Sequence, residues 1–158
     1  MGMARRLFLV CTLALAGCVV QNPELPTFAS AERSLLPPAS GMARLYFYRL
    51  LEPSDPALGT MVMLNQQPVG FSRNGTVLYR DVTPGTYFVS VLSRGQYPFQ
   101  FKTVQVQAGQ VWYFRIESLA SWAGCNGKGD CRGDTFVVAI VDPAQARVEI
   151  APLGLLPG

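Results

Sequence analysis

The sequence predicts an all-β protein, built as a small antiparallel β-sandwich that follows a signal peptide and a tether. From about residue 43 the chain consists of short runs rich in β-branched and aromatic residues, separated by turn residues such as Asn74-Gly75 and Asp142-Pro143. Several of these runs alternate apolar and polar residues with a period of two. No helical pattern is long enough for the crossover that joins parallel strands, which disfavours a parallel α/β sheet.

The first residues have the pattern of a bacterial lipoprotein signal. Arg5 and Arg6 precede an apolar run over residues 7–16, which is shorter than the roughly 20 residues of a membrane-spanning helix. Leu15-Ala16-Gly17-Cys18 resembles a lipobox, so we expect residues 1–17 to be removed and Cys18 to carry a diacylglyceryl thioether and an N-acyl chain such as palmitate. Three acyl chains would anchor the protein stably to a membrane. The alternative is that Cys18 is an ordinary core thiol behind a standard signal peptide.

Sorting and domain boundaries follow from the residues after the lipobox. Val19 takes the place of the Asp that retains enteric lipoproteins on the inner membrane, which predicts the periplasmic face of the outer membrane. Residues 18–41 are rich in Pro, Ser and Ala and are expected to form a lipidated tether, with a short helix around residues 31–36. The β-sandwich is expected over residues 42–151, with an insertion at 118–134 and a C-terminal tail at 152–158.

Eight runs are expected to form the strands of the sandwich: residues 43–50, 60–65, 77–82, 86–93, 99–106, 111–118, 135–141 and 146–152. Alternation assigns their inward faces, namely Tyr87, Val89 and Val91 in one strand and Trp112, Phe114 and Ile116 in another. The apolar phase shifts within residues 99–106, which predicts a bulge near Lys102-Thr103 or a change of face. Residues 135–141 are apolar on both sides, as in a strand that is covered on both faces.

Four segments resemble the bacterial lipoproteins that contain the domain of unknown function numbered 2846. They are GMARLYFYRL (41–50), VMLNQQPVGFSRNGTVLYRDVTPGTYFVSV (62–91), VQAGQVWYFRIE (106–117) and DPAQARVEI (142–150). The middle segment is also similar to PEGA-type surface modules. Both resemblances imply a prealbumin-like sandwich in which Pro84-Gly85 turns into the next strand, and neither implies an activity.

The composition argues against several function classes. The chain has 13 basic and 10 acidic residues, and loss of Arg5 and Arg6 with the signal brings the two counts almost level, whereas a nucleic-acid-binding protein needs a basic stripe. The sequence contains no histidine, which removes the commonest general base and metal ligand. Neither Lys102 nor Lys128 lies in a nucleophile motif. We therefore expect no enzymatic activity and no cofactor.

The cysteines predict one disulfide bond. Cys11 leaves with the signal and Cys18 is acylated, so Cys125 and Cys131 remain, and an oxidising compartment favours a bond between them. A zinc site would need two further ligands, and the mature chain offers neither histidine nor another free cysteine. No metal site is therefore expected at these cysteines.

Two alternatives stay open for the same insertion. Asn126, Asp130 and Asp134 could ligate calcium, although their spacing differs from that of an EF-hand. Residues 132–134 form an Arg-Gly-Asp tripeptide that integrins recognise, but such a tripeptide recurs by chance, and the preferred interpretation is a polar turn that leads into the strand at residue 135.

Outward-facing aromatic residues are the candidates for contact with a partner. Alternation places Tyr46 and Tyr48 opposite the inward face of residues 43–50, and Tyr113 and Phe88 also fall on outer faces. Trp122 in the insertion is a further candidate. The competing interpretation is that the tether or the C-terminal segment covers these aromatics.

The functional hypothesis is a lipid-anchored envelope lipoprotein that binds another envelope component, protein or glycan, without catalysis. The alternative is a structural or accessory subunit of a larger envelope or secretion assembly. An enzyme is the weakest of the three hypotheses.

Overall fold

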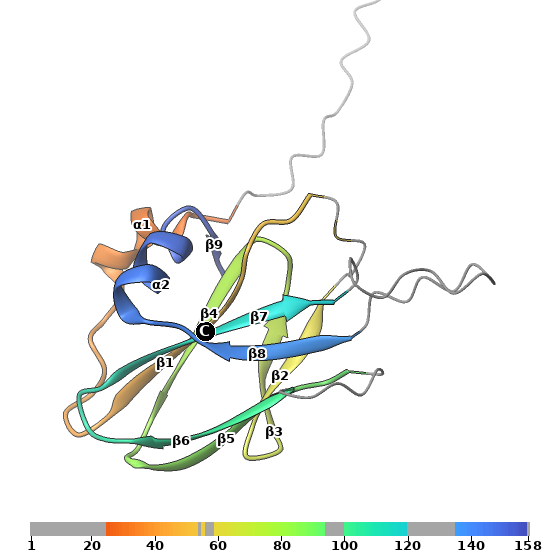
Figure 1. Ribbon diagram of the computed structural model, residues 1–158. Helices are drawn as coiled ribbons and strands as arrows, with labels where there is room; N and C mark the ends of the chain where they lie inside the picture. Colours follow the sequence, from red (N-terminus) through yellow and green to blue (C-terminus); the bar gives the residue numbers. More distant parts are fainter. Residues whose placement is uncertain (1–24, 54, 56–58, 94–99, 120–134, 158) are drawn as a thin grey trace, which may run out of the picture.

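The protein is a two-sheet β-sandwich, as the computed structural model in Figure 1 shows. The structure describes residues 25–53, 55, 59–93, 100–119 and 135–157. Its helices are α1 (Phe28–Ala31), the 3-10 helix η1 (Glu32–Ser34) and α2 (Pro143–Ile150), and its strands are β1 (Ala43–Arg49), β2 (Thr60–Leu64), β3 (Gln67–Ser72), β4 (Thr76–Val82), β5 (Gly85–Val91), β6 (Phe101–Val106), β7 (Val111–Ser118), β8 (Phe136–Ile140) and β9 (Gly154–Leu155). The predicted all-β sandwich is confirmed.

The larger sheet has the order β8-β7-β1-β4-β9, and the smaller has the order β3-β2-β5-β6. The larger sheet is mixed, because β1 pairs in parallel with β7 and β4 pairs in parallel with β9. The smaller sheet is antiparallel throughout. No long helix connects β1 to β7 in the described chain, since the strands between them, β2, β3, β5 and β6 of the smaller sheet and β4 of the larger one, make the connection.

The core lies between the two sheets and follows the predicted alternation. The residues expected to face inward in β5 and β7 all contribute to it, with Phe114 fully buried and Trp112 partly buried. Phe47 of β1 stacks on Phe114, with 5.4 Å between the ring centroids. Phe136 and Val138 of β8 close this core on the side of the larger sheet. Alternation with a period of two therefore positions the inner faces correctly.

Two local predictions need correction, and a third is resolved between its two alternatives. Residues 146–152 are expected to be a strand, but α2 covers residues 146–150 and a turn follows, because Asp142 caps the helix by accepting from the Ala144 N–H and Pro143 starts the first turn. In β6 the predicted change of face is confirmed and the alternative bulge is not, because β6 pairs with β5 without a register shift while Phe101 faces outward and Val104 and Val106 are buried. The N-terminal helix begins at Phe28, earlier than expected, because Thr27 caps it.

Strand β3 was not predicted. It forms a hairpin with β2 through Asn65 and Gln66, which have φ values of 50° and 64° and so make a tight reversal with both residues in the left-handed region. A register shift between Val62 and Met63 breaks the alternation of the pair. Pro68 and Gly70 weaken the strand pattern further, which explains why the sequence did not show it.

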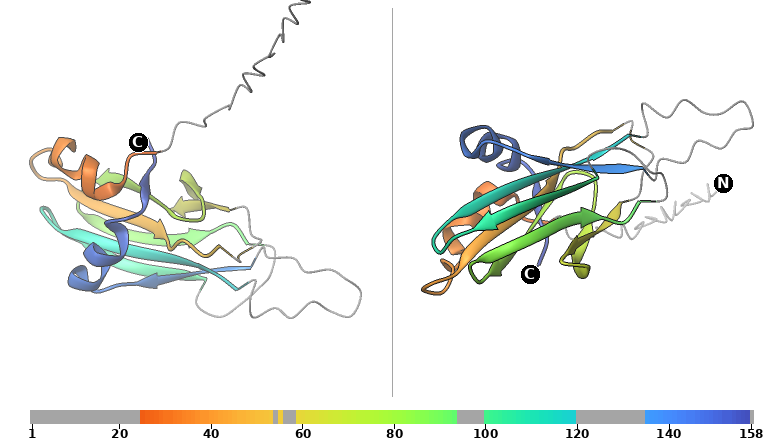
Figure 2. Two further views of the ribbon diagram at one scale, coloured as in Figure 1. Left: turned by 90° about the horizontal axis from the view of Figure 1, so that it is seen from above. Right: turned by 60° about the horizontal axis from the view of Figure 1, so that its bottom comes forward.

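The terminal segments form a third layer over the outer face of the larger sheet (Figure 2). They are joined to each other by main-chain hydrogen bonds, from Phe28 N to Leu153 O at 2.7 Å and from Leu155 N to Pro26 O at 2.8 Å. Arg44 adds a bond from its guanidinium to the carbonyl of Leu36 at 2.8 Å. Among the described residues, no helix has the length and apolar character needed to cross a membrane.

Candidate functional site

The three predicted contact tyrosines that the structure describes are buried. Tyr46, Tyr48 and Tyr113 are 7 %, 0 % and 4 % exposed. Tyr46 stacks on Tyr113 with 5.3 Å between centroids and receives the edge of Phe28 at 5.4 Å. Together with Ile150 they belong to a second core beneath the terminal segments. Their assignment as a partner-binding surface is wrong, and the competing interpretation, in which the chain itself covers them, describes the structure.

A polar cluster fixes α2 on this second core. The carboxylate of Glu149 accepts hydrogen bonds from the Tyr48 hydroxyl at 2.6 Å, from Arg115 at 2.9 Å and from Gln145 at 2.7 Å. Partial burial alone would raise the pKa of Glu149, but these hydrogen bonds and the charge of Arg115 outweigh it and hold the pKa below its usual range. Burial, and then the bond to Glu149, raises the pKa of Tyr48. Each of these groups is hydrogen-bonded to another member of the cluster, so the cluster has a structural role in holding α2 on the sheet.

The remaining predicted site residues lie outside the described part of the chain. They are Cys18, Trp122, Cys125 and Cys131, together with the possible calcium ligands and the Arg-Gly-Asp tripeptide between residues 126 and 134. Lipidation, the disulfide bond and the contact role of Trp122 therefore stay predictions. Within the described residues, no three His, Cys, Asp or Glu side chains lie close enough together to hold a metal ion.

An exposed apolar surface lies on the opposite side of the molecule, on the outer face of the four-stranded sheet. The register of β3, β2, β5 and β6 brings its side chains together, because residues directly opposite in antiparallel strands share a face. We call it the bare face, and it consists of Met61, Met63, Phe71, Phe88, Leu92 and Phe101. Leu92 and Phe101 are 59 % and 55 % exposed, and the rings of Phe88 and Phe101 lie 4.9 Å apart.

No charged side chain lies on the bare face within the described strands. Lys102 of β6 pairs with Val89, which is fully buried, so the Lys102 side chain starts from the inner side of the sheet. The outward polar residues of β5 and β6 are uncharged: Thr86, Ser90, Thr103 and Gln105. The described part of this surface therefore offers apolar contact and uncharged hydrogen-bonding groups, but no charge.

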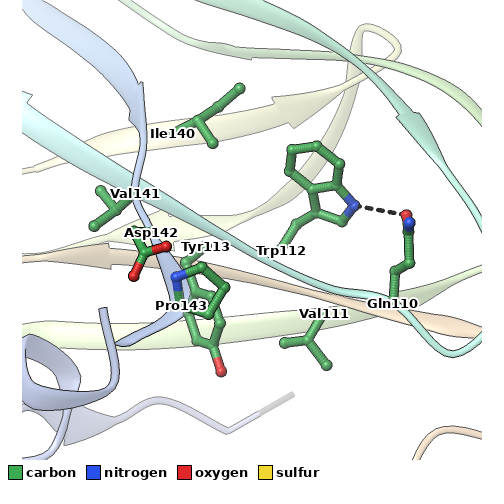
Figure 3. A pocket seen from close by; sticks show the side chains of 8 residues that line it. All are labelled: Gln110, Val111, Trp112, Tyr113, Ile140, Val141, Asp142 and Pro143. Atoms are coloured by element: carbon green, nitrogen blue, oxygen red, sulfur yellow. Dashed lines mark hydrogen bonds between the residues drawn. The ribbon is translucent and has the colours of Figure 1, made fainter. Parts of the chain in front are cut away.

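A pocket of about 340 Å³ opens beside the first residues of β7 (Figure 3). Its lining residues are Gln110, Val111, Trp112, Tyr113, Ile140, Val141, Asp142 and Pro143. The Trp112 indole N–H donates to the Gln110 amide oxygen at 3.0 Å, which is the hydrogen bond drawn in Figure 3. The pocket is mainly apolar, and its volume lies at the lower end of the range of small-molecule sites.

Local sequence patterns contain signals for the bare face and none for the pocket. Met61 and Met63 alternate with buried residues in β2, and Phe101 is out of phase with Val104 in β6, so an outward apolar set could have been assigned. The pocket depends on where β8 ends relative to β7, which is a long-range feature of register. Local patterns do not contain it.

Comparison with known proteins gives one family. No curated protein matches the chain. A sequence model of a protein family of unknown function, DUF2846, matches residues 39–131. The match includes β1 to β7 and ends within the insertion, whereas α1, β8, α2 and β9 lie outside it. The predicted resemblance is confirmed, and the chain belongs to the DUF2846 family.

Proposed function

We propose that this protein is a lipid-anchored component of the bacterial cell envelope that binds another envelope protein and catalyses no reaction. The observation that carries the binding role is the bare face. Met and aromatic residues are enriched in protein interfaces, and the flexible thioether of Met adapts to different partner shapes. The chain uses its own terminal segments to cover one outer face of the sandwich and leaves this one uncovered among the described residues.

The chemistry of the bare face favours a protein as the partner. A phosphate or an acidic glycan would need cationic side chains, and none lies on this face in the described strands. Neutral sugars need several converging hydrogen-bonding groups, whereas the larger side chains here are Met, Leu and Phe. An apolar patch of about 300–600 Å² is the scale at which an exposed surface in a monomer is often functional. The complementary surface is therefore an apolar patch on another protein.

The anchor in this proposal rests on the sequence. Leu25, the first described residue, contacts Gly154 at the β9 edge of the larger sheet. Residues 18–24 then connect Cys18 to the domain, and an extended chain of that length reaches about 25 Å. An acylated Cys18 would keep the domain within that distance of the bilayer surface and limit its search for partners to the envelope.

The absence of catalysis is proposed on chemical grounds. The chain has no histidine, and the strongest cluster of ionisable groups in the described residues, around Glu149, is used to hold α2 on the sheet. Its groups bond to each other, and none is left to act on a substrate.

Photocrosslinking in intact cells tests the binding role. A photoreactive amino acid replaces Phe101 on the bare face or, as a control, Val148, which is 76 % exposed on α2. We expect Phe101 to give one dominant protein adduct that is absent with Val148. Adducts with lipid alone would assign the face to the bilayer, and equal labelling at both positions would remove the bare face as a specific surface. The mass of the adduct after mild detergent extraction separates a single partner from a large assembly.

The anchor has its own test. Cys18→Ser is expected to abolish incorporation of labelled palmitate and to release the protein from the membrane fraction, while Cys11→Ser changes neither. Membrane association that persists in Cys18→Ser without label would contradict the anchor.

A further inference from the structure

Strand β7 extends beyond its neighbour β8 and leaves part of its edge unpaired. β7 pairs with β8 only from Phe114 to Ser118, whereas it pairs with β1 from Val111 onward. β8 ends at Ile140 because the next residues, Asp142 and Pro143, turn the chain into α2. On the side away from β1, no described strand accompanies the first three residues of β7.

The main-chain groups of Val111 point to that open side. Arg44 N donates to Gln110 O at 3.0 Å, so the peptide groups of Gln110 and Trp112 face β1, and those of Val111 and Tyr113 face the other way. Tyr113 O is used there, since it accepts from Val141 N at 3.0 Å. Within the described chain, the N–H and C=O of Val111 have no strand partner. They form a short, free hydrogen-bonding edge.

The pocket described above lies beside this edge. Val111 and Ile140, which are 38 % and 44 % exposed, lie on its rim in Figure 3, and the indole of Trp112 borders it. The polar atoms nearby are largely occupied, because the Gln110 amide oxygen accepts from Trp112 and from Gln107 N, and Asp142 caps α2. A ligand would therefore find main-chain hydrogen-bonding groups next to an apolar hollow.

The other edges of the two sheets carry features that discourage pairing. β3 contains Pro68, and β6 has Lys102 on its inner side. On β8 the N–H and C=O of Phe136 are bonded to the side chains of Ser93 and Gln100. β9 is only two residues long. The start of β7 has no such feature in the described residues, and unlike the part of β4 that extends beyond β9, it lies beside the pocket.

We propose that the start of β7 binds an extended apolar peptide segment of another protein, which adds to the sheet as a short strand. Its main chain pairs with the N–H and C=O of Val111, and one apolar side chain enters the pocket between Trp112 and Ile140. The free main-chain groups belong to Val111, so the peptide forms few bonds and binds weakly and reversibly. This site lies in the larger sheet, apart from the bare face, and it does not depend on the proposed function.

The test uses five-residue peptides with blocked ends, Thr-Xaa-Thr-Xaa-Thr, in which Xaa is Val, Leu or Phe, added to the full protein in mild detergent. Binding is followed by the backbone amide signals in NMR spectra. We expect at least one peptide to shift the amides of Val111 and Tyr113 and to slow the hydrogen exchange of Val111. The same peptide with N-methylated amides on its pairing edge is expected not to bind.

Two variants separate the edge from the pocket. Relative to Val111→Ala, which also removes the valine side chain at the pocket rim but keeps the N–H, Val111→Pro removes an N–H that the fold does not use, at the first residue of a strand, where proline is tolerated. It should weaken binding at least fivefold, as expected for loss of one hydrogen bond. Ile140→Ser should weaken it by a similar factor through the pocket, whereas Val148→Ser, on the exposed side of α2, should not change it.

Three outcomes would overturn the proposal: no peptide shifts these amides at millimolar concentration, the N-methylated peptide binds equally well, or both site variants bind like the parent. Loss of the crosslink at Phe101 would leave this site unaffected, so the failure of one proposal is distinguishable from that of the other.

Discussion

The bond between Tyr48 and Glu149 gives the sharpest test of how the terminal layer is held. Tyr48 is fully buried in β1, and its hydroxyl donates to a Glu149 carboxylate oxygen at 2.6 Å. Tyr48→Phe removes the hydroxyl and keeps the ring, so packing in the second core is preserved. The substitution therefore isolates one hydrogen bond to a charged acceptor.

The expected loss of unfolding free energy is about 1.5 kcal/mol. Hydrogen bonds to charged groups contribute about 1.5–3 kcal/mol. The low end applies because Glu149 keeps its bonds from Arg115 and Gln145 and its side chain is 17 % exposed. Urea unfolding measures the loss, and Tyr79→Phe is the matched control. The hydroxyl of Tyr79 makes no hydrogen bond among the described residues, so less than about 0.5 kcal/mol is expected there.

The difference between parent and Tyr48→Phe should depend on pH in a definite way. The pKa of Glu149 is lower in the folded state, so its contribution is complete above the unfolded value of about 4.3 and is lost as the pH falls through the folded pKa. The pKa of Tyr48 is higher in the folded state, so its contribution is complete below about 10 and declines as the pH rises above that value. The free-energy difference should therefore be largest between about pH 5 and 9. A difference that stays constant from pH 3 to pH 7, or a loss no larger than that of Tyr79→Phe, would refute this reasoning.

Two further stability predictions follow from the packing. Phe114→Ala should cost about 3–5 kcal/mol because the ring is fully buried, whereas Phe101→Ala on the bare face should cost less than about 1 kcal/mol, and a comparison of their denaturant midpoints checks both. Gly59→Ala should cost about 1–3 kcal/mol or more, because its φ is +147° and a Cβ would lie 2.3 Å from the carbonyl oxygen of Ser72. Thermal unfolding of Gly59→Ala with no change in midpoint would show that the loop relaxes without cost.

Local alternation predicts the faces of strands but not what covers them. In β1 the sequence correctly placed Tyr46 and Tyr48 opposite the inward face. Their burial depends on Phe28, Ile150 and Leu153, which come from segments without a regular apolar period. Nothing in the pattern of β1 itself distinguishes a face that is covered by remote segments from a face that contacts a partner.

The error at residues 146–152 has the same origin. Ala146 to Ile150 alternate as in a strand, and Asp142-Pro143 is equally a turn signal and the start of a helix. The helix is favoured by the capping bond from Ala144 N to Asp142 and by the burial of Ala146 and Ile150 against the sheet. Tertiary packing thus decides between two local structures that the sequence leaves nearly equal.

The family match includes the strands of both outer faces but not the segments that cover one of them. Residues 39–131 contain all four strands of the bare face, but they contain neither α1 nor α2 and β9, which cover Tyr46, Tyr48 and Tyr113. A domain limited to the matched residues would expose apolar surface on both sides. In this chain the flanking segments cover the face that carries Tyr46, Tyr48 and Tyr113, and the Glu149 cluster holds α2 there. Among the described residues, they do not cover the bare face. Because apolar surface is costly to leave in water, the side that the chain does not cover with its own residues is the side we assign to a partner.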